Sequence, residues 1–183
     1  MGSVDLMGSM TMLPFLAAVL AGAASGVGAA DVDASNLSGV FQATCLDGQA
    51  RLRAGEVTPI SYDQLPEGLR ESLGRPASGK VWRLSAAGNS YLYMLDYNDS
   101  DGSSKVCGLA SDSGEMRAAG DMLEARMTGS VARNRPRTAQ WLNARDGYVA
   151  TATSASTLKV LQISWMSEAA KAKAQAQVEQ LPH

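Results

Sequence analysis

The sequence predicts an α+β domain, built as a single antiparallel sheet flanked by helices. Strand-like alternation between turn-forming residues occurs in five segments: 80–86, 90–97, 104–110, 147–153 and 157–166. Helix-like segments precede and follow the first three of these strands. The composition, 45% hydrophobic and 19% charged, is that of an ordinary globular domain. Together these observations favour one domain over residues 31–166.

Residues 1–30 are predicted to be a secretory signal peptide. An apolar stretch from Met10 to Ala24 is followed by small residues that fit cleavage after Ala29 or Ala30. The segment carries no Lys or Arg, which departs from the usual pattern. An uncleaved anchor is the alternative, but its strongly apolar part is shorter than the roughly 20 residues that span a bilayer. We therefore expect a periplasmic or secreted protein whose mature chain has no transmembrane helix.

The mature chain is expected to open with a strand and a short helix. Residues 37–45 ("LSGVFQATC") are predicted to be the first strand, because their valine and phenylalanine favour β structure. Residues 65–76 are predicted to be a helix, since Pro66 suits a first turn and leucines recur at every fourth position. Gly74 and Pro76 are the stop signals of that helix.

The strand at 90–97 is predicted to have two apolar faces. One face carries Tyr91, Tyr93, Leu95 and Tyr97, and the other carries Leu92, Met94 and Asp96. A strand that is apolar on both sides belongs in the centre of a sheet, covered at least in part on each side.

A second helix is predicted at 112–129. Asp112 and Glu115 have the spacing of a capping box, and the apolar residues that follow share one helical face. The alternation within 121–127 leaves a strand as the alternative for that part. A further strand is predicted at 137–144, and the Ala/Lys/Gln-rich tail at 167–183 is expected to form a marginal, exposed helix.

The order helix, three strands, helix, three strands suggests an internal duplication. "SYLYMLDY" with "SKVCGLAS" and "GYVATAT" with "LKVLQISW" occupy equivalent places, although few residues are identical. Two such units would form one continuous antiparallel sheet with two helices on one face. A sheet without internal repetition is the alternative.

Cys45 and Cys107 are the two cysteines of the chain, and an even number in an exported protein predicts a disulfide. A metal site would need further Cys or His ligands, and a thiol nucleophile would need a base, commonly His. The one histidine is the last residue, His183. The sequence therefore favours a structural disulfide over either site.

The acidic segment at 96–102 ("DYNDSDG") is the place where a calcium loop has to be considered. With Gly102 at the sixth position of an EF-hand loop, neither the first nor the twelfth position carries a suitable oxygen ligand. We therefore predict a hairpin turn there. "STLK" at 156–159 matches the S-x-x-K signature of penicillin-recognising enzymes, but its partner motifs are missing and a hairpin is again expected.

Several chemistries are excluded or left without support by the sequence. With no histidine in the body of the chain, Ser-His-Asp catalysis and His-ligated zinc are excluded. No segment matches a phosphate-binding loop or a dinucleotide fingerprint, so no cofactor is predicted. A net charge of −2 gives no whole-chain reason to expect nucleic acid as a partner. Hydrolysis by two carboxylates remains possible.

Two groups of residues are candidate binding surfaces. Arginines gather around one tryptophan in "RNRPRTAQWLNAR": Arg133, Arg135, Arg137 and Arg145 with Trp141. Such a group suits an anionic polymer, while a solvated turn beside a core tryptophan is the alternative. The tyrosine row of 90–97 (Tyr91, Tyr93 and Tyr97) would be either a stacking surface or a face packed under a helix.

The segments "TCLDG", "LPEGLRESLGRPASGKVWRL", "YLYMLDY" and "KVCGLAS" resemble small exported proteins of alphaproteobacteria, particularly of the sphingomonad kind. The resemblance covers roughly residues 41–113. It implies a periplasmic setting and a Cys45–Cys107 pair, and it implies no activity.

The expected function is that of a non-catalytic periplasmic binding or accessory protein. Its partner would be an envelope protein or polysaccharide rather than nucleic acid. The alternative is a small cell-envelope hydrolase that uses carboxylates alone, which would require two Asp or Glu in one cleft, about 5–10 Å apart. The sequence leaves the ligand and the oligomeric state open.

Overall fold

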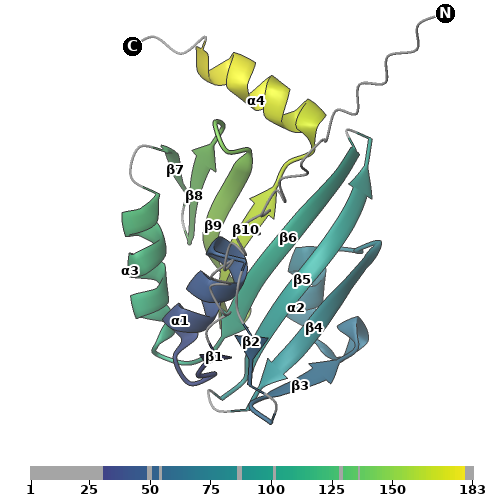
Figure 1. Cartoon of the computed structure of the whole chain (residues 1–183), viewed down its shortest axis with the longest axis vertical. Coiled ribbons are helices and arrows are strands. Elements are labelled where there is room, and N and C mark those ends of the chain that lie inside the picture. Colours follow the sequence, from purple (N-terminus) through teal and green to yellow (C-terminus); the bar gives the residue numbers. More distant parts are fainter. Residues whose placement is uncertain are drawn as a thin grey trace, which may run out of the picture.

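The computed structural model describes residues 31–179, except 49–50, 54, 86–87, 101, 128–129 and 136. The signal peptide predicted at residues 1–30 lies outside this range. Within it, the chain forms an antiparallel sheet of eight strands and a small parallel pair, β1 (Asp31–Val32) with β2 (Arg51–Leu52). The predicted α+β fold with one main antiparallel sheet is confirmed (Figure 1).

The eight strands form two meanders that meet in the middle of the sheet. The sheet runs β3-β4-β5-β6-β10-β9-β8-β7. Its strands are β3 (Val57–Ile60), β4 (Ser78–Leu84), β5 (Ser90–Asp99), β6 (Gly102–Ser111), β7 (Val131–Arg135), β8 (Thr138–Asn143), β9 (Tyr148–Ala155) and β10 (Leu158–Trp165). Each half therefore has four strands rather than the three predicted, because β3 and β7 extend the two edges.

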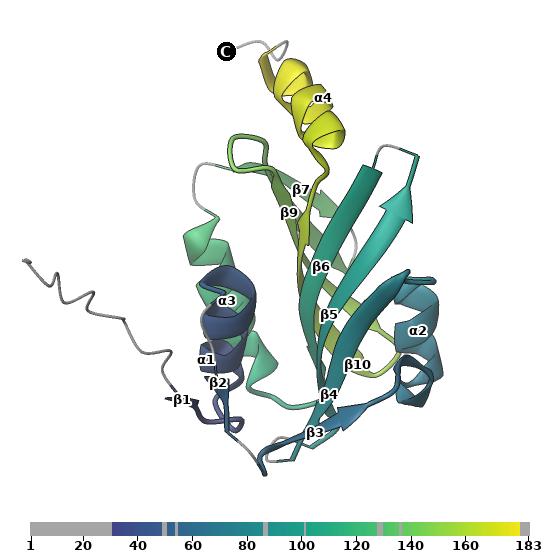
Figure 2. The ribbon, with the colours of Figure 1, turned by 45° about the vertical axis from the view of Figure 1, so that its right-hand side comes forward.

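Helices cover both faces of the sheet. On one face lie α1 (Leu37–Phe41), the π-helical turn η1 (Gln42–Leu46) and α3 (Met116–Arg126); on the other lie the 3-10 turn η2 (Tyr62–Gln64) and α2 (Glu67–Leu73) (Figure 2). The two helices predicted at 65–76 and 112–129 therefore exist, but they lie on opposite faces. The expectation that both would share one face is wrong.

The strand predicted at 37–45 is wrong, because this segment is helical. Asn36 accepts a hydrogen bond from the Gly39 amide at 2.9 Å, so it caps the first turn of α1. Leu37, Val40 and Phe41 are fully buried, which is the spacing of one helical face. Burial of that face against the sheet and α3 outweighs the β preference of valine and phenylalanine.

The capping box predicted at Asp112 and Glu115 is also wrong. The carboxylate of Asp112 instead accepts hydrogen bonds from the amide and side chain of Asn89 in the β4–β5 connection. Helix α3 begins at Met116, and Glu115 provides no side-chain cap. The helix itself is confirmed, with Met116, Ala119 and Leu123 buried.

Strand β5 has two covered faces, as predicted, and each contributes to a separate core. Leu92 belongs to the core beneath α1 and α3, together with Leu109, Leu161 and Ile163 from the neighbouring strands. The tyrosine row belongs to the core beneath α2, whose residues include Leu65, Leu69, Val81, Tyr91, Tyr93 and Leu95. The sheet is thus the middle layer between two hydrophobic cores.

The Cys45–Cys107 disulfide is present and joins η1 to β6, with a Cα–Cα distance of 5.3 Å. The bridge closes a sequence separation of 62 residues. Since β6 is a central strand, the disulfide anchors the N-terminal helical turns to the middle of the sheet.

The edge strand β3 has features that discourage pairing with another chain. Strand β3 is four residues long and contains Pro59, which has no backbone N–H.

Strand β7 was not predicted, because its arginines and asparagine have weak β propensity. It is held by pairing with β8, from Val131↔Leu142 to Arg135↔Thr138.

The tail forms helix α4 (Glu168–Glu179) at one end of the sheet. The Ala170 amide donates to the Ser167 hydroxyl at 3.2 Å, so Ser167 caps the first turn of this helix. Ala174 is the one buried residue of this helix, so it packs little against the domain. None of the helices in the described part of the chain has the length and apolar character to cross a bilayer.

Candidate functional site: a groove on the open end of the sheet

The tyrosine row is packed under α2 and is not an open surface. Tyr93 is fully buried and Tyr91 is 8% exposed. The Tyr97 hydroxyl donates to the Leu73 carbonyl at 2.8 Å, and the Tyr62 hydroxyl donates to the carbonyls of Arg70 and Gly74. These bonds satisfy carbonyl groups at the C-terminal end of α2. The row therefore fixes the helix to the sheet, and a stacking role for it is ruled out by burial.

Burial changes the acidity of these phenols. It raises the pKa of Tyr97 to about 12, because ionisation would place a charge in a poorly solvated site. Burial raises the pKa of Tyr93 further above its ordinary value and that of Tyr62 in the same direction. None of the three is therefore suited to acid–base chemistry at neutral pH.

The tryptophan of the arginine–tryptophan group is a core residue, and two of the arginines lie in different turns. Trp141 is 8% exposed and belongs to the core beneath α1 and α3. Arg137 lies in the β7–β8 turn and Arg145 in the β8–β9 turn, so strand β8 separates them. Arg133 and Arg135 lie on β7, opposite Gln140 and Thr138; their side chains are outside the described residues. The core alternative for the tryptophan is therefore correct.

The acidic segment forms a tight hairpin turn between β5 and β6. Pairing continues as far as Asp99↔Gly102, which leaves two residues in the loop. In the part of the chain that the structure describes, no three Asp, Glu, His or Cys residues come close enough to hold a metal ion. The "STLK" motif also falls on a hairpin, since Ser156 lies in the β9–β10 turn with a φ of 57°.

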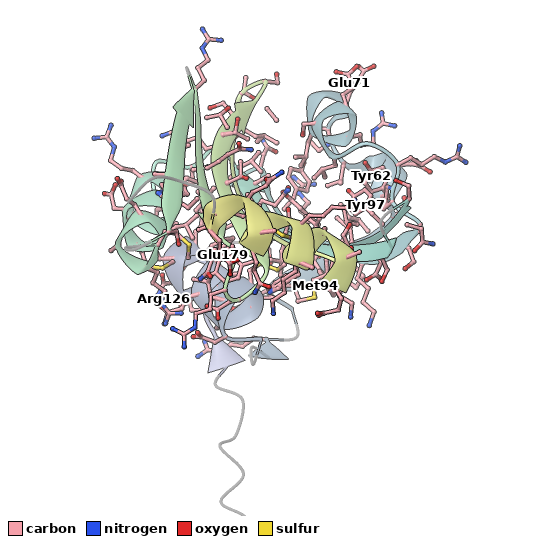
Figure 3. The ribbon with its side chains drawn as sticks, turned by 90° about the horizontal axis from the view of Figure 1, so that it is seen from above. Tyr62, Glu71, Met94, Tyr97, Arg126 and Glu179 are labelled. Atoms are coloured by element: carbon pink, nitrogen blue, oxygen red, sulfur yellow. A yellow bond between two sulfur atoms is a disulfide. The ribbon has the colours of Figure 1, made fainter. Side chains whose placement is uncertain are left out.

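A groove of about 500 Å³ opens on the face that carries α1 and α3, toward the end of the sheet near α4. Strands β4, β5, β6 and β10 and the turn η1 form its walls. Its lining includes Thr44, Ser78, Lys80, Met94, Asp96, Lys105, Val106 and Trp165. Figure 3 shows Met94 on the opposite side of the sheet from Tyr62 and Tyr97.

Strand register explains why these side chains converge. Lys80, Met94 and Cys107 are cross-strand neighbours in one row, and Ser78, Asp96, Lys105 and Trp165 form the next. Directly opposed residues of antiparallel strands place their side chains on the same face. The groove therefore has an apolar floor, from Met94 to Trp165, between two lysines.

The charged side chains of the groove differ in their partners: the aspartate has a hydrogen-bond donor, whereas the two lysines have no carboxylate partner among the described residues. Asp96 accepts a hydrogen bond from the Ser78 hydroxyl at 2.8 Å. Neither Lys80 nor Lys105 makes an ion pair with a carboxylate among the described residues, where Arg53–Glu56 and Arg126–Asp47 do form ion pairs. Both lysines are exposed, so the rim of the groove presents net positive charge.

Two further features distinguish the groove from ordinary surface. Met94 is 37% exposed and is the one exposed large hydrophobic side chain among the described residues. Thr44, on η1 beside the disulfide, is 7% exposed, and its hydroxyl has no hydrogen-bond partner in the described structure. A buried hydroxyl without a partner costs about 1–3 kcal/mol of stability.

The hydrolase alternative needs two carboxylates in one cleft. Four grooves lined by described residues each contain at most one Asp or Glu: Asp96 here, Asp63 and Glu67 in two others, and none in the fourth. None of these four grooves therefore brings together the two carboxylates that paired-carboxylate hydrolysis requires.

Sequence reasoning placed Met94 and Asp96 on one strand face but did not identify the groove. The missing information was the register that sets Lys80 and Lys105 beside them, together with the helical turn η1. A comparison of the chain with protein-family models, curated proteins and solved structures found no match.

Proposed function

We propose that this protein is a non-catalytic binding or accessory protein that acts outside the cytoplasm, and that the groove around Met94 holds an anionic partner with an apolar part. The observation that carries the proposal is the position of Met94 between Lys80 and Lys105, which have no carboxylate partner among the described residues. An apolar floor with a few fixed polar groups is the usual make-up of a binding site.

The location outside the cytoplasm is supported by the disulfide and by the signal-peptide pattern of residues 1–30. Disulfides form and persist in oxidising compartments and are rare in the cytosol. The envelope protein or polysaccharide expected from the sequence stays a proposal, and the lysines favour an acidic member of either class.

A small aromatic sulfonate, anilinonaphthalene sulfonate, tests the site because it joins an apolar body to one negative charge. We expect its fluorescence to rise on binding, and the NMR signals of the Met94 methyl group and the Trp165 indole N–H to shift during the titration. The methyl signals of Met116 and Met127, which lie at the two ends of α3 and are buried in the core between α3 and the sheet, should stay in place.

The matched variants are Lys80→Glu with Lys105→Glu in the groove, and Lys159→Glu as the control. Lys159 is an exposed lysine on β10, paired with Ser111 at the other end of the sheet. The double variant should weaken dye binding by at least about tenfold, since two attractions become repulsions, whereas the control should not. The proposal would be refuted if the dye bound without shifting the NMR signals of Met94 and Trp165. It would also be refuted if the groove variant and the control variant weakened dye binding equally.

A further inference from the structure

Strand β4 has an uncovered edge over its first three residues. Strand β3 pairs with β4 only from Val57↔Leu84 to Ile60↔Val81. At Ser61 the chain leaves the sheet and turns into η2, where Ser61 and Gln64 form a capping box. Ser78, Gly79 and Lys80 are consequently exposed, although all three still pair with β5 on their inner side.

The uncovered edge presents backbone groups that suit another strand. The Ser85 amide donates to the Glu56 carbonyl, so odd-numbered residues of β4 direct their backbone groups toward β3. Pro59, which cannot donate, faces Trp82, as this alternation requires. Continued along the strand, the alternation directs the N–H and C=O of Gly79 toward the open edge; it ends at Ala77, whose amide donates inward to the Asp96 carbonyl of β5.

Two grooves flank this edge, one on each face of the sheet. The groove around Met94 lies on one side, and a second, of about 530 Å³, lies on the other. The second is lined by Ile60, Tyr62, Asp63, Arg75, Val81 and Leu95 among others. Ser78, Gly79 and Leu95 line both grooves, so the edge of β4 is the ridge between them.

The two grooves differ in charge. The Met94 groove carries two lysines against one aspartate, whereas the second groove balances Arg75 with Asp63 around an apolar surface. In an added antiparallel strand, residues opposite Ser78 and Lys80 would face the first groove. The residue between them, opposite Gly79, would face the second. The Leu95 side chain leans over Gly79, which has no side chain of its own, and offers an apolar contact to a residue at this middle position.

We infer that the free edge of β4 accepts an extended acidic peptide by strand addition, with an acidic–apolar–acidic triplet across Ser78, Gly79 and Lys80. This inference rests on the proposed function and names the partner class of the same groove. Backbone hydrogen bonds hold such a strand, and alternate side chains entering the two grooves give it specificity.

A second copy of this chain fits the edge less well. Antiparallel pairing of two β4 edges about Gly79 would bring Lys80 of one copy close to Ser78 and the Met94 groove of the other, adding positive charge to a rim that already carries two lysines. Like charges on neighbouring strands are destabilising, and an edge lysine commonly prevents self-association. An acidic strand from a different protein removes this repulsion.

The test uses an acetylated and amidated peptide, Thr-Glu-Leu-Glu-Thr, titrated into the full mature chain and followed by the NMR amide signal of Gly79. Two backbone-methylated versions provide the contrast. Methylation of the leucine nitrogen removes the N–H that would bond to Gly79 and should weaken binding by at least about tenfold. Methylation of the second glutamate nitrogen, which points away from β4, should change the affinity by less than about twofold.

Side-chain contributions are tested with the same peptide. Lys80→Glu should weaken binding by about fivefold or more, and Lys159→Glu should leave it within about twofold. The inference is overturned if the leucine-methylated peptide binds as well as the unmodified one, or if the unmodified peptide does not bind. In the latter case, a dye that still shifts the Met94 and Trp165 signals would leave the proposed function standing, whereas loss of both would refute it too.

Discussion

The ring of Tyr93 lies directly over Gly108 of the neighbouring strand, and its hydroxyl donates to the Gln162 side chain at 3.0 Å. A Cβ atom at residue 108 would overlap the tyrosine ring and hydroxyl. The glycine thus creates the space in which a large aromatic residue crosses the centre of the sheet, from β5 over β6 to β10.

Gly108→Ala should therefore destabilise the protein. The added methyl group forces a fully buried ring to move in a close-packed core, and such overpacking costs about 1–3 kcal/mol. Urea unfolding, followed by tryptophan fluorescence, would measure the loss as a lower midpoint with an unchanged slope.

Gly120→Ala is the matched substitution with the opposite expectation. Gly120 lies inside α3, and a Cβ atom there would meet nothing within 4 Å. Alanine is favoured over glycine in a helix interior, so the free energy of unfolding should rise by about 0.5–1 kcal/mol. Equal losses in the two alanine variants would contradict the steric explanation.

Tyr97 should make the domain sensitive to alkali. Below pH of about 10, the phenol is protonated in both the folded and unfolded states, so its contribution to stability is complete. As the pH rises toward the folded pKa of about 12, the unfolded chain releases a proton that the folded chain retains, and stability falls. Unfolding midpoints measured across this range should decline.

Tyr97→Phe isolates this effect. At neutral pH the variant loses the hydrogen bond to the Leu73 carbonyl, a cost of about 1 kcal/mol. Above pH of about 10, its stability should decline less steeply than that of the wild type, because one titrating phenol is missing. Parallel pH profiles for the two proteins would show that Tyr97 does not contribute.

Removal of the disulfide by Cys45→Ala with Cys107→Ala should lower the free energy of unfolding by about 2–5 kcal/mol. The bridge closes a separation of 62 residues in the unfolded chain and fixes η1 to β6 in the folded one. Because Thr44 on η1 lines the groove, the double variant should also bind the sulfonate dye more weakly at a temperature where it is still folded. Unchanged dye binding would show that η1 keeps its position beside the groove without the disulfide.

Asn36→Ala should cost about 1 kcal/mol, because α1 loses the side chain that accepts from the Gly39 amide. Asn36→Asp keeps a side-chain oxygen at the cap and adds a favourable charge at a helix N-terminus, so it should be neutral or slightly stabilising. Chemical denaturation of both variants checks the pair. A similar loss in both would mean that the cap oxygen is not the cause.

Much of the sheet was predictable because its strands carry local signals. Alternation and turn residues identified β4, β5, β6, β9 and β10, and the even number of cysteines identified the disulfide. Helix α1 was missed because Val40 and Phe41 suit a strand in isolation. What makes them helical is a partner distant in sequence, α3, together with the cap at Asn36.

The groove was not predictable, because it depends on pairings between separate segments. The sequence showed Met94 on one face of a strand, but not that Lys80 pairs opposite it or that Lys105 lies in the next row. The position of Trp141 was not predictable for a related reason, since its neighbours in sequence do not reveal that it packs into the core beneath α1 and α3. Strand register and helix placement, which no single segment encodes, decided both outcomes.

The order of strands also sets the order in which the sheet can be assembled. Strand β6 is complete at Ser111, but its second neighbour, β10, does not begin until Leu158. Until β10 has been synthesised, one edge of β6 is unpaired. This edge later lies at the centre of the complete sheet. Exposed edges of this kind aggregate readily, and distant pairings form slowly. The first meander of a nascent chain should therefore be prone to aggregation until β10 is available.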